Sequence, residues 1–352
     1  MALRGAGISY PAFYTLDRER GYALRAGANG VWTREGRGHV RVNSAGFRGA
    51  EASPQPAPGV LRIAVLGDSF TEALQVDAPA SWVEQLQSRL SHAHQCRLRQ
   101  GFPSGVEVLN FGVGGYGTGQ EWLTWRHLAR NYRPDLVLLA LYPGNDFTDN
   151  EPISRQDRPV FRLGNKGELI RDDSFRSSTS YRWRSSLPGQ VLDGLINQSR
   201  LLQLVNEAKN RAAARRPSPA VAPATGALAP LPPPQASGQA WAITEALLAR
   251  LATDTAAQGA RFAVVSTSAP EQVWPRRHQR PADPFAQERR LASMLAARHI
   301  PYLPLGPSFQ RQVDAQGLTL HGFVGQAPGH GHWNATGHRL AAAAIAPWLC
   351  AR

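Results

Sequence analysis

An apolar stretch that stops abruptly in a Gly-Asp-Ser sequence ending at Ser69 constrains the fold of this chain more than any other feature. Residues 61–66 read Leu-Arg-Ile-Ala-Val-Leu, a composition typical of a strand buried on both faces. A serine directly after such a strand is expected at the carboxyl edge of a parallel sheet, where α/β proteins place their chemistry. The capping-box spacing of Ser81 and Glu84 predicts that a helix follows.

Three later segments place glycine or polar residues after a predicted strand or before a predicted helix. A predicted strand over 106–111 leads into a loop with four glycines, which allow backbone N–H groups to point at an anion. A second strand, over 134–142, ends shortly before Asn145. The last segment carries His332 and leads into an alanine-rich helix that is expected to end near Trp348. Serine, glycine, asparagine and histidine therefore follow one another along the chain.

The C-terminal third continues the alternation of helix and strand. Apolar periodicity predicts helices over 241–255 and 283–298, and strands over 261–267 and 300–305. Parallel strands joined by helices form a sheet that is covered on both faces. The predicted fold is therefore α/β, a three-layer doubly wound arrangement around a parallel five-stranded sheet.

Three segments interrupt this pattern. Residues 1–58 contain short alternating stretches that predict a small β-rich N-terminal element. Residues 151–210 form an insertion, expected to comprise a hairpin and one long helix, which either covers the site as a cap or lid or packs to one side. Residues 211–239 are rich in alanine and proline and are expected to form a linker. This division leaves 59–150 and 240–352 as the α/β domain.

The four segments, in that order, resemble the SGNH hydrolase superfamily, also called GDSL esterases and lipases. The resemblance implies a flavodoxin-like sheet and a serine nucleophile at Ser69. It also implies an oxyanion hole made of the backbone N–H groups of Ser69 and Gly115 and the side-chain amide of Asn145. The neighbouring Gly112 and Gly114 are alternatives to Gly115.

The same resemblance implies that His332 is the general base, with His330 as an alternative. The superfamily usually carries an aspartate two or three residues before this histidine, to orient its ring. Those positions hold His330 and Gly329 here. Three interpretations stay open: a backbone carbonyl orients the ring, a carboxylate from elsewhere such as Asp314 does so, or the enzyme is weakened.

Other polar and aromatic residues adjoin the proposed site. Asp68 and Asp146 are expected to cap turns, and a supporting catalytic role is the alternative. The histidines near the C-terminus lack accompanying cysteines or a carboxylate cluster, so no metal and no cofactor are expected. Four aromatic residues are candidates either for stacking on sugar rings or for the core: Tyr116, Trp122, Tyr142 and Trp333.

The net charge of +13 comes almost entirely from arginine, since the only lysines are Lys166 and Lys209. The arginines are scattered and no nucleic-acid motif occurs, so specific nucleic-acid binding is not expected. Weak association with anionic surfaces, such as acidic polysaccharide or lipid, is expected instead.

The sequence does not identify a compartment. It contains no run of eighteen apolar residues and no apolar signal-peptide core near its N-terminus. A periplasmic or extracellular location is expected if a leader has been removed, and a cytoplasmic one otherwise. Cys96 and Cys350 lie far apart in sequence, and nothing in the sequence decides whether they pair.

These observations predict a serine esterase that hydrolyses short, acetyl-like esters on carbohydrate through an acyl-Ser69 intermediate. The preference for carbohydrate follows from a resemblance to bacterial SGNH proteins associated with acyl groups on cell-surface polysaccharides. Two alternatives remain at this point: an O-acyltransferase that uses the same intermediate, and a carbohydrate-binding pseudoenzyme without catalysis. The oligomeric state is not predicted.

Overall fold

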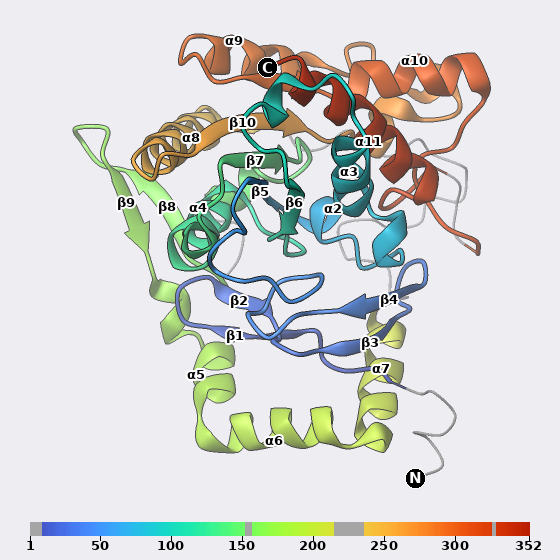
Figure 1. Cartoon of the computed structure of the whole chain (residues 1–352). Coiled ribbons are helices and arrows are strands. Elements are labelled where there is room, and N and C mark those ends of the chain that lie inside the picture. Colours follow the sequence, from blue (N-terminus) through green and yellow to red (C-terminus); the bar gives the residue numbers. More distant parts are fainter. Residues whose placement is uncertain (1–8, 152–156, 215–235, 326–328) are drawn as a thin grey trace.

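A five-stranded parallel sheet forms the centre of the protein (Figure 1). The computed structural model describes residues 9–151, 157–214, 236–325 and 329–352. Along the sheet the strands follow the order β11-β10-β7-β5-β6, and they comprise β5 (Val60–Gly67), β6 (Gly105–Asn110), β7 (Leu136–Leu141), β10 (Arg261–Ser266) and β11 (Tyr302–Pro304). The predicted α/β fold with a doubly wound sheet is confirmed.

Each face of the sheet carries a layer of helices. Side chains alternate along β5, so that Ile63 and Val65 join one buried cluster and Ala64 and Leu66 join the other. The first cluster is completed by α3 (Trp82–Ser91), α10 (Gly306–Gln316) and α11 (Ala335–Cys350). The second is completed by α4 (Thr118–His127), α8 (Gly238–Ala256) and α9 (Ala286–Ala296).

The strand order places a topological switch point between β5 and β7. Numbered within the sheet alone, the order is 2-1-3-4-5, and folds of this type bind ligands outside the carboxyl ends of their first and third strands. β5 is followed by the one-turn helix α2 (Ser69–Glu72), and β7 leads to Asn145. Both residues singled out from the sequence therefore lie at this point.

Two small hairpins precede the sheet and lie below it in the view of Figure 1. Their strands are β1 (Tyr14–Asp17), β2 (Gly21–Leu24), β3 (Asn29–Trp32) and β4 (Gly38–Arg41). Apolar side chains from these hairpins form a third cluster with Leu74, Val113 and Tyr116, which belong to the loops after β5 and β6. The N-terminal element is thus packed against the loops that surround the switch point.

A buried arginine ties the N-terminal element to the segment that follows the serine. Arg48 is 3% exposed. Its guanidinium donates 2.7 Å hydrogen bonds to the carbonyl oxygens of Glu72 and Val76, and it also bonds the carbonyl of Ala73. Burial lowers the pKa of Arg48 to about 10, so the group stays charged at neutral pH.

The insertion contains the expected hairpin, β8 (Val160–Leu163) with β9 (Leu169–Asp172). The prediction of one long helix after it is wrong, because the structure has three separate helices, which are divided by the extended backbone of Ser186 and Ser199. These helices are α5 (Thr179–Ser185), α6 (Leu187–Gln198) and α7 (Arg200–Ala214). Of the expected linker, residues 215–235 lie outside the described residues, and its two edges belong to the ends of α7 and α8.

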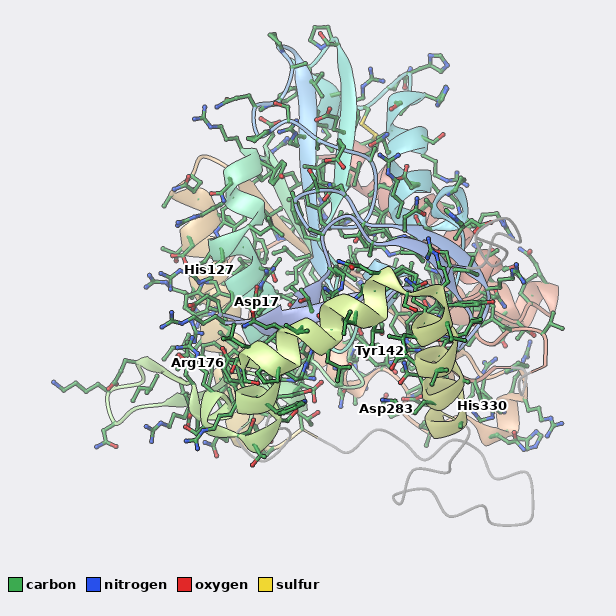
Figure 2. The ribbon with its side chains drawn as sticks, turned by 90° about the horizontal axis from the view of Figure 1, so that it is seen from below. Asp17, His127, Tyr142, Arg176, Asp283 and His330 are labelled. Carbon is green, nitrogen blue, oxygen red and sulfur yellow. A yellow bond between two sulfur atoms is a disulfide. The ribbon has the colours of Figure 1, made fainter. Side chains whose placement is uncertain are left out.

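Helices α6 and α7 pack against the N-terminal segment. Asn197 and Gln203 accept hydrogen bonds from the backbone N–H groups of Ala12 and Tyr10, at 3.0 and 3.1 Å. Seen from below, α5, α6 and α7 lie in front of the N-terminal strands, and Tyr142 is labelled in the space between α6 and α7 (Figure 2). The insertion therefore lies on the same side of the sheet as the switch point.

Short 3₁₀ helices connect several of these elements. In the described residues they are η1 (Ala78–Ala80), η2 (Arg97–Arg99), η3 (Ala129–Tyr132), η4 (Thr148–Asn150), η5 (Ser174–Ser177), η6 (Pro270–Val273) and η7 (Arg277–Gln279). Cys96, just before η2, forms a disulfide with Cys350 at the end of α11. The pairing that the sequence left open is therefore present in the structure.

We expect Arg48→Ala to lower the free energy of unfolding by about 3 kcal/mol, because it removes the buried guanidinium and leaves three carbonyl groups without its hydrogen bonds. Urea unfolding followed by circular dichroism measures this change. Arg41→Ala, at an exposed position on β4, is the matched control and should change stability by less than about 0.5 kcal/mol. Equal effects of the two substitutions would contradict the anchoring role of Arg48.

Candidate active site

Ser69 is positioned by the tight passage from β5 into α2. Asp68 caps this helix, since its carboxylate accepts a 2.9 Å hydrogen bond from the backbone N–H of Phe70. Gly67 has a φ of +159°, and a Cβ at this position would lie 2.3 Å from the hydroxyl oxygen of Thr71. A side chain at residue 67 would therefore push the turn apart, and the serine with it.

A cavity of about 300 Å³ opens at the switch point, beside Ser69. Gly115, from the loop after β6, and Asn145, from the loop after β7, line it together with Ser69. Asn145 donates one amide hydrogen to Asp149 at 2.6 Å, which fixes the orientation of its side chain. The structure thus brings together the residues that the sequence proposed for the oxyanion hole.

The glycine-rich loop after β6, which carries Gly114 and Gly115, is held in place by the N-terminal element and by the insertion. Tyr22 donates a 2.9 Å hydrogen bond to the carbonyl oxygen of Gly114, and Arg158 donates one to the carbonyl oxygen of Gly115. Gly115 has a φ of +75°, in the region that favours glycine. The two alternatives to Gly115 lie against α2. A Cβ at Gly112 would meet the Glu72 backbone, and a Cβ at Gly114 would meet the Glu72 carboxylate.

His332 lies in the loop before α11 and faces the serine. Its Nε2 atom is 2.7 Å from the hydroxyl oxygen of Ser69. The other ring nitrogen, Nδ1, bonds a carboxylate, so Nδ1 carries the ring proton and Nε2 accepts the hydrogen bond from the serine.

The carboxylate belongs to Glu35, which the sequence analysis did not consider. One Glu35 oxygen accepts the Nδ1 hydrogen bond, and the other accepts a 2.7 Å hydrogen bond from the backbone N–H of His332. The interpretation of a carboxylate from elsewhere in the chain is thus correct, but its example is wrong, because Asp314 bonds the guanidinium of Arg280 at 2.7 Å. A backbone carbonyl does not orient the ring, because Nδ1 bonds Glu35. Serine, imidazole and carboxylate therefore form a continuous chain of hydrogen bonds.

Glu35 reaches the histidine from the turn between β3 and β4. Gly331 makes room for it, since a Cβ at this glycine would lie 2.1 Å from a Glu35 oxygen. The sequence held one signal, because Glu35 is the only acidic residue between positions 20 and 50. No spacing rule connects it with His332, however, because 297 residues separate the two.

Electrostatics favour a charged carboxylate beside the imidazole. Burial raises the pKa of Glu35, but its hydrogen bonds from His332 outweigh this and hold the pKa below its usual range. Burial lowers the pKa of His332, but the bond to Glu35 and the nearby charges of Asp68 and Glu72 raise it above 6.5 overall. Glu35 is therefore ionised at neutral pH and stabilises the protonated ring.

The three residues considered as supporting groups have separate contacts. His330 packs edge-on against Trp274, with ring centroids 4.4 Å apart. Asp68 caps α2, as described, and Asp146 accepts a 2.7 Å hydrogen bond from the backbone N–H of Tyr142. In the described part of the chain, the alternative base His330 has no hydrogen bond to Ser69.

The remaining candidates divide between the core and the cavity. Among the described residues, no group of three or more His, Cys, Asp and Glu side chains is arranged to hold a metal ion. Tyr116, Trp122 and Trp333 are buried in the hydrophobic clusters, so they are unable to stack on a sugar. Tyr142 alone of the four aromatic candidates lines the cavity.

Comparison with known proteins gives low similarity throughout. No protein-family model and no curated protein matches the sequence. Among solved structures, the acetyl xylan esterase AlAXEase is 12% identical with a TM-score of 0.44, over 82% of this chain and 100% of that chain. A catalytic mutant of Axe2, an acetylxylan esterase from Geobacillus stearothermophilus, is 12% identical with a TM-score of 0.43, over 82% and 94%. TesA is 16% identical with a TM-score of 0.40, over 82% and 97%.

The sheet has the doubly wound order that the sequence predicted. The carboxylate departs from the pattern that the resemblance implied, since Glu35 precedes Ser69 in sequence instead of adjoining His332.

We expect Glu35→Gln to lower kcat for ester hydrolysis by about 10²- to 10⁴-fold, because an amide neither fixes the tautomer nor stabilises the imidazolium. The raised pKa of His332 means that the wild-type rate rises with pH through a value above 6.5. Loss of the Glu35 charge should move this titration to lower pH. Rate profiles across pH test both effects.

Asp314→Asn is the matched control, since it neutralises the carboxylate that was first considered and that pairs with arginines away from the site. It should leave kcat and the pH profile unchanged, and Glu35→Asp should restore part of the loss. An unchanged profile in Glu35→Gln would refute the role of Glu35.

A buried carboxyl group below the site predicts a second pH effect. Burial, followed by the charge of Asp68, raises the pKa of Glu121 well above 4.5, and neither carboxyl oxygen has a hydrogen-bond partner among the described residues. Folded protein therefore retains a proton that the unfolded chain releases, so stability from this group is present at low pH and is lost as pH rises.

Glu121→Gln should flatten the decline in the free energy of unfolding between about pH 5 and 8, by up to about 1.4 kcal/mol per pH unit. Chemical unfolding at several pH values measures it. Glu245→Gln, in an exposed ion pair with Arg298, is the control and should leave the slope unchanged. An unchanged slope in Glu121→Gln would show that Glu121 is ionised in the folded state.

Proposed function

We propose that this protein is a serine esterase of the SGNH type that hydrolyses short acyl esters on carbohydrate through an acyl-Ser69 intermediate. The observation that carries the proposal is the 2.7 Å contact between the Ser69 hydroxyl and Nε2 of a histidine whose Nδ1 is bound by Glu35. A serine hydroxyl is a poor nucleophile at neutral pH and needs such a base within hydrogen-bond reach.

In the first step, Ser69 Oγ attacks the ester carbonyl while its proton passes to His332 Nε2. Glu35 stabilises the imidazolium that results. The carbonyl oxygen becomes an oxyanion, for which the backbone N–H groups of Ser69 and Gly115 and the Asn145 amide are the donors. Such donors act strongly because they are already oriented before the reaction, and loss of one typically costs about 10²- to 10³-fold in kcat.

The tetrahedral intermediate then collapses and breaks the ester bond. His332 returns the proton to the departing alcohol oxygen, which leaves the acyl group on Ser69. Water enters, gives a proton to His332 and attacks the acyl carbonyl through a second oxyanion. Release of the carboxylic acid restores the serine and the neutral imidazole.

The size and lining of the cavity support a small acyl group. A volume of about 300 Å³ is at the low end for ligand pockets. Phe70 and Pro270 provide apolar walls, and Tyr142 adds an aromatic ring of the kind that stacks on sugars. A short acyl ester on a saccharide fits this combination better than a long-chain lipid does.

The exposure of the base favours hydrolysis over acyl transfer. The His332 side chain is 28% exposed, so water has access to the imidazole. The pseudoenzyme alternative rested on the missing aspartate, and Glu35 removes that reason. Transfer to a sugar hydroxyl remains the second candidate, because it uses the same acyl-Ser69.

The cysteine pair supports an oxidising compartment for this chemistry. The Cys96–Cys350 disulfide is of a kind that persists outside the reducing cytoplasm. In the described part of the chain, none of the helices combines the length and the apolar character needed to cross a bilayer.

We expect Ser69→Ala to abolish hydrolysis of p-nitrophenyl acetate, and His332→Ala to lower kcat almost as far, because the two groups act as one unit. Asn145→Ala should lower kcat by about 100-fold or more. Initial rates give these values, and mass spectrometry of the trapped wild-type protein should find the acyl group on Ser69.

His330→Ala is the matched control, because its ring lies beside Trp274 instead of Ser69. If it impaired turnover more than His332→Ala, the choice of base would be wrong. Product analysis on an acetylated saccharide, with and without a free sugar acceptor, separates the esterase from the transferase. Equal and negligible turnover by wild type and Ser69→Ala would contradict both.

A further inference from the structure

Helices α5, α6 and α7 expose an apolar face that the esterase chemistry does not use. Among the described residues, nine large apolar side chains are exposed, and eight of them lie on these three helices. The most prominent are 50–78% exposed and comprise Trp183, Leu187, Val191, Leu195, Leu201 and Val205. We call these six residues the apolar face.

The polarity of α6 and α7 is reversed relative to an ordinary surface helix. The side that meets the N-terminal segment is polar, since Asp193 and Asn197 of α6 bond Arg25 and the backbone of Ala12. Leu187, Val191 and Leu195 recur every four residues and are exposed, on the side of the helix that faces away from Asp193. A surface helix normally turns its apolar residues toward the core.

Helix α7 repeats this arrangement. Gln203 and Glu207 face inward, where Gln203 bonds the Tyr10 backbone and Glu207 pairs with Arg34 at 3.4 Å. Leu201 and Val205 lie on the opposite, exposed side. The reversal therefore extends over both helices.

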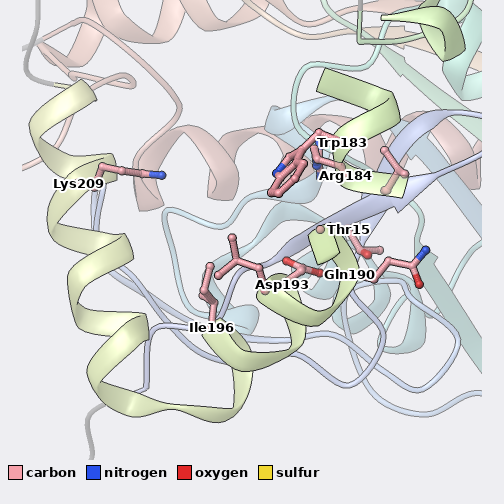
Figure 3. Close-up of a pocket in the computed structure, with 10 residues that line it drawn as sticks. Thr15, Trp183, Arg184, Gln190, Asp193, Ile196 and Lys209 are labelled. Atoms are coloured by element: carbon pink, nitrogen blue, oxygen red, sulfur yellow. The ribbon is translucent and has the colours of Figure 1, made fainter. Parts of the chain in front are cut away.

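Positive charge predominates among the side chains of α5–α7. The two acidic residues of α5–α7, Asp193 and Glu207, are both in ion pairs with the N-terminal segment. Arg182 and Arg184 of α5 and Lys209 of α7 are exposed. Figure 3 shows Arg184 and Lys209 on two sides of a hollow of about 510 Å³ that α6 borders.

We propose that the apolar face docks on an anionic lipid bilayer, with α6 and α7 lying in the plane of the interface. Helices that bind membranes in this way combine a broad apolar face with basic residues and bury the face at the boundary of headgroups and acyl chains. The exposed cations complement anionic headgroups. A second copy of this chain fits less well, because the same cations would then meet one another.

Docking in this orientation puts the bilayer on the side of the sheet that carries the switch point, with the N-terminal hairpins between α6 and the sheet (Figure 1). The helices lie on the side of the sheet where Tyr142 lines the cavity (Figure 2). The proposal does not depend on the esterase chemistry, since no residue of the apolar face lines the cavity among the described residues.

The test is sedimentation of the whole protein with vesicles of phosphatidylcholine and phosphatidylglycerol in equal parts, compared with vesicles of phosphatidylcholine alone. We expect binding to the mixed vesicles that weakens with added salt. The triple variant Leu187→Gln, Val191→Gln, Leu195→Gln should lower the affinity by about 100-fold. Arg182→Ala with Arg184→Ala should lower it by about tenfold.

Matched controls come from exposed positions elsewhere. Val324→Gln changes an exposed apolar residue outside the three helices, and Arg89→Ala with Arg339→Ala removes two exposed cations from the helices beside the sheet. Both controls should bind like wild type. Hydrolysis of p-nitrophenyl acetate in solution should be unchanged in every variant, which verifies that each has folded.

Three outcomes overturn the proposal. The first is no sedimentation with the mixed vesicles, and the second is undiminished binding by the triple α6 variant. The third is a wild-type dimer, detected by light scattering, that dissociates in the triple variant while vesicles fail to bind. That last result would assign the apolar face to a second copy of the chain.

Discussion

The hydrogen-bonded contact between the Glu35 carboxylate and the His332 ring is the interaction on which the rest of the site depends. It requires a charged group from a two-stranded hairpin to be held against a loop at the far end of the chain, and partly buried charges need fixed partners. Arg48 anchors the hairpin region to the segment after Ser69, and Glu207 bonds Arg34 beside the acid. The N-terminal element is therefore part of the site.

That element also shapes the other side of the cavity. Tyr14 donates a 2.8 Å hydrogen bond to Glu72, the last residue of α2, and Tyr22 bonds the glycine-rich loop after β6. Burial raises the pKa of Glu72 to about 7 and that of Asp68 to about 6. Two acidic groups with raised pKa values therefore lie next to the serine, and small changes in their burial alter the charge near His332.

The sequence predicted what depends on local pattern. Five apolar runs predicted the strands of the sheet. The polar residues that follow two of them predicted that Ser69 and Asn145 lie at the same sheet edge, and the structure has both at the switch point. Glu35 was missed because it meets His332 only in space, without spacing or motif. The helix break at Ser199 was missed for a different reason: the apolar period continues across it, and backbone contacts with Asn197 and Gln203 decide where each helix packs.

The separation of the three groups along the chain has a consequence for synthesis. Glu35 and Ser69 leave the ribosome early, whereas His332 follows Ser69 by 263 residues. At about 5–20 residues per second, the serine exists for a time on the order of tens of seconds before its base is made. The three groups that we propose for catalysis are therefore complete only after the segment that carries His332 has been made and has packed beside Ser69.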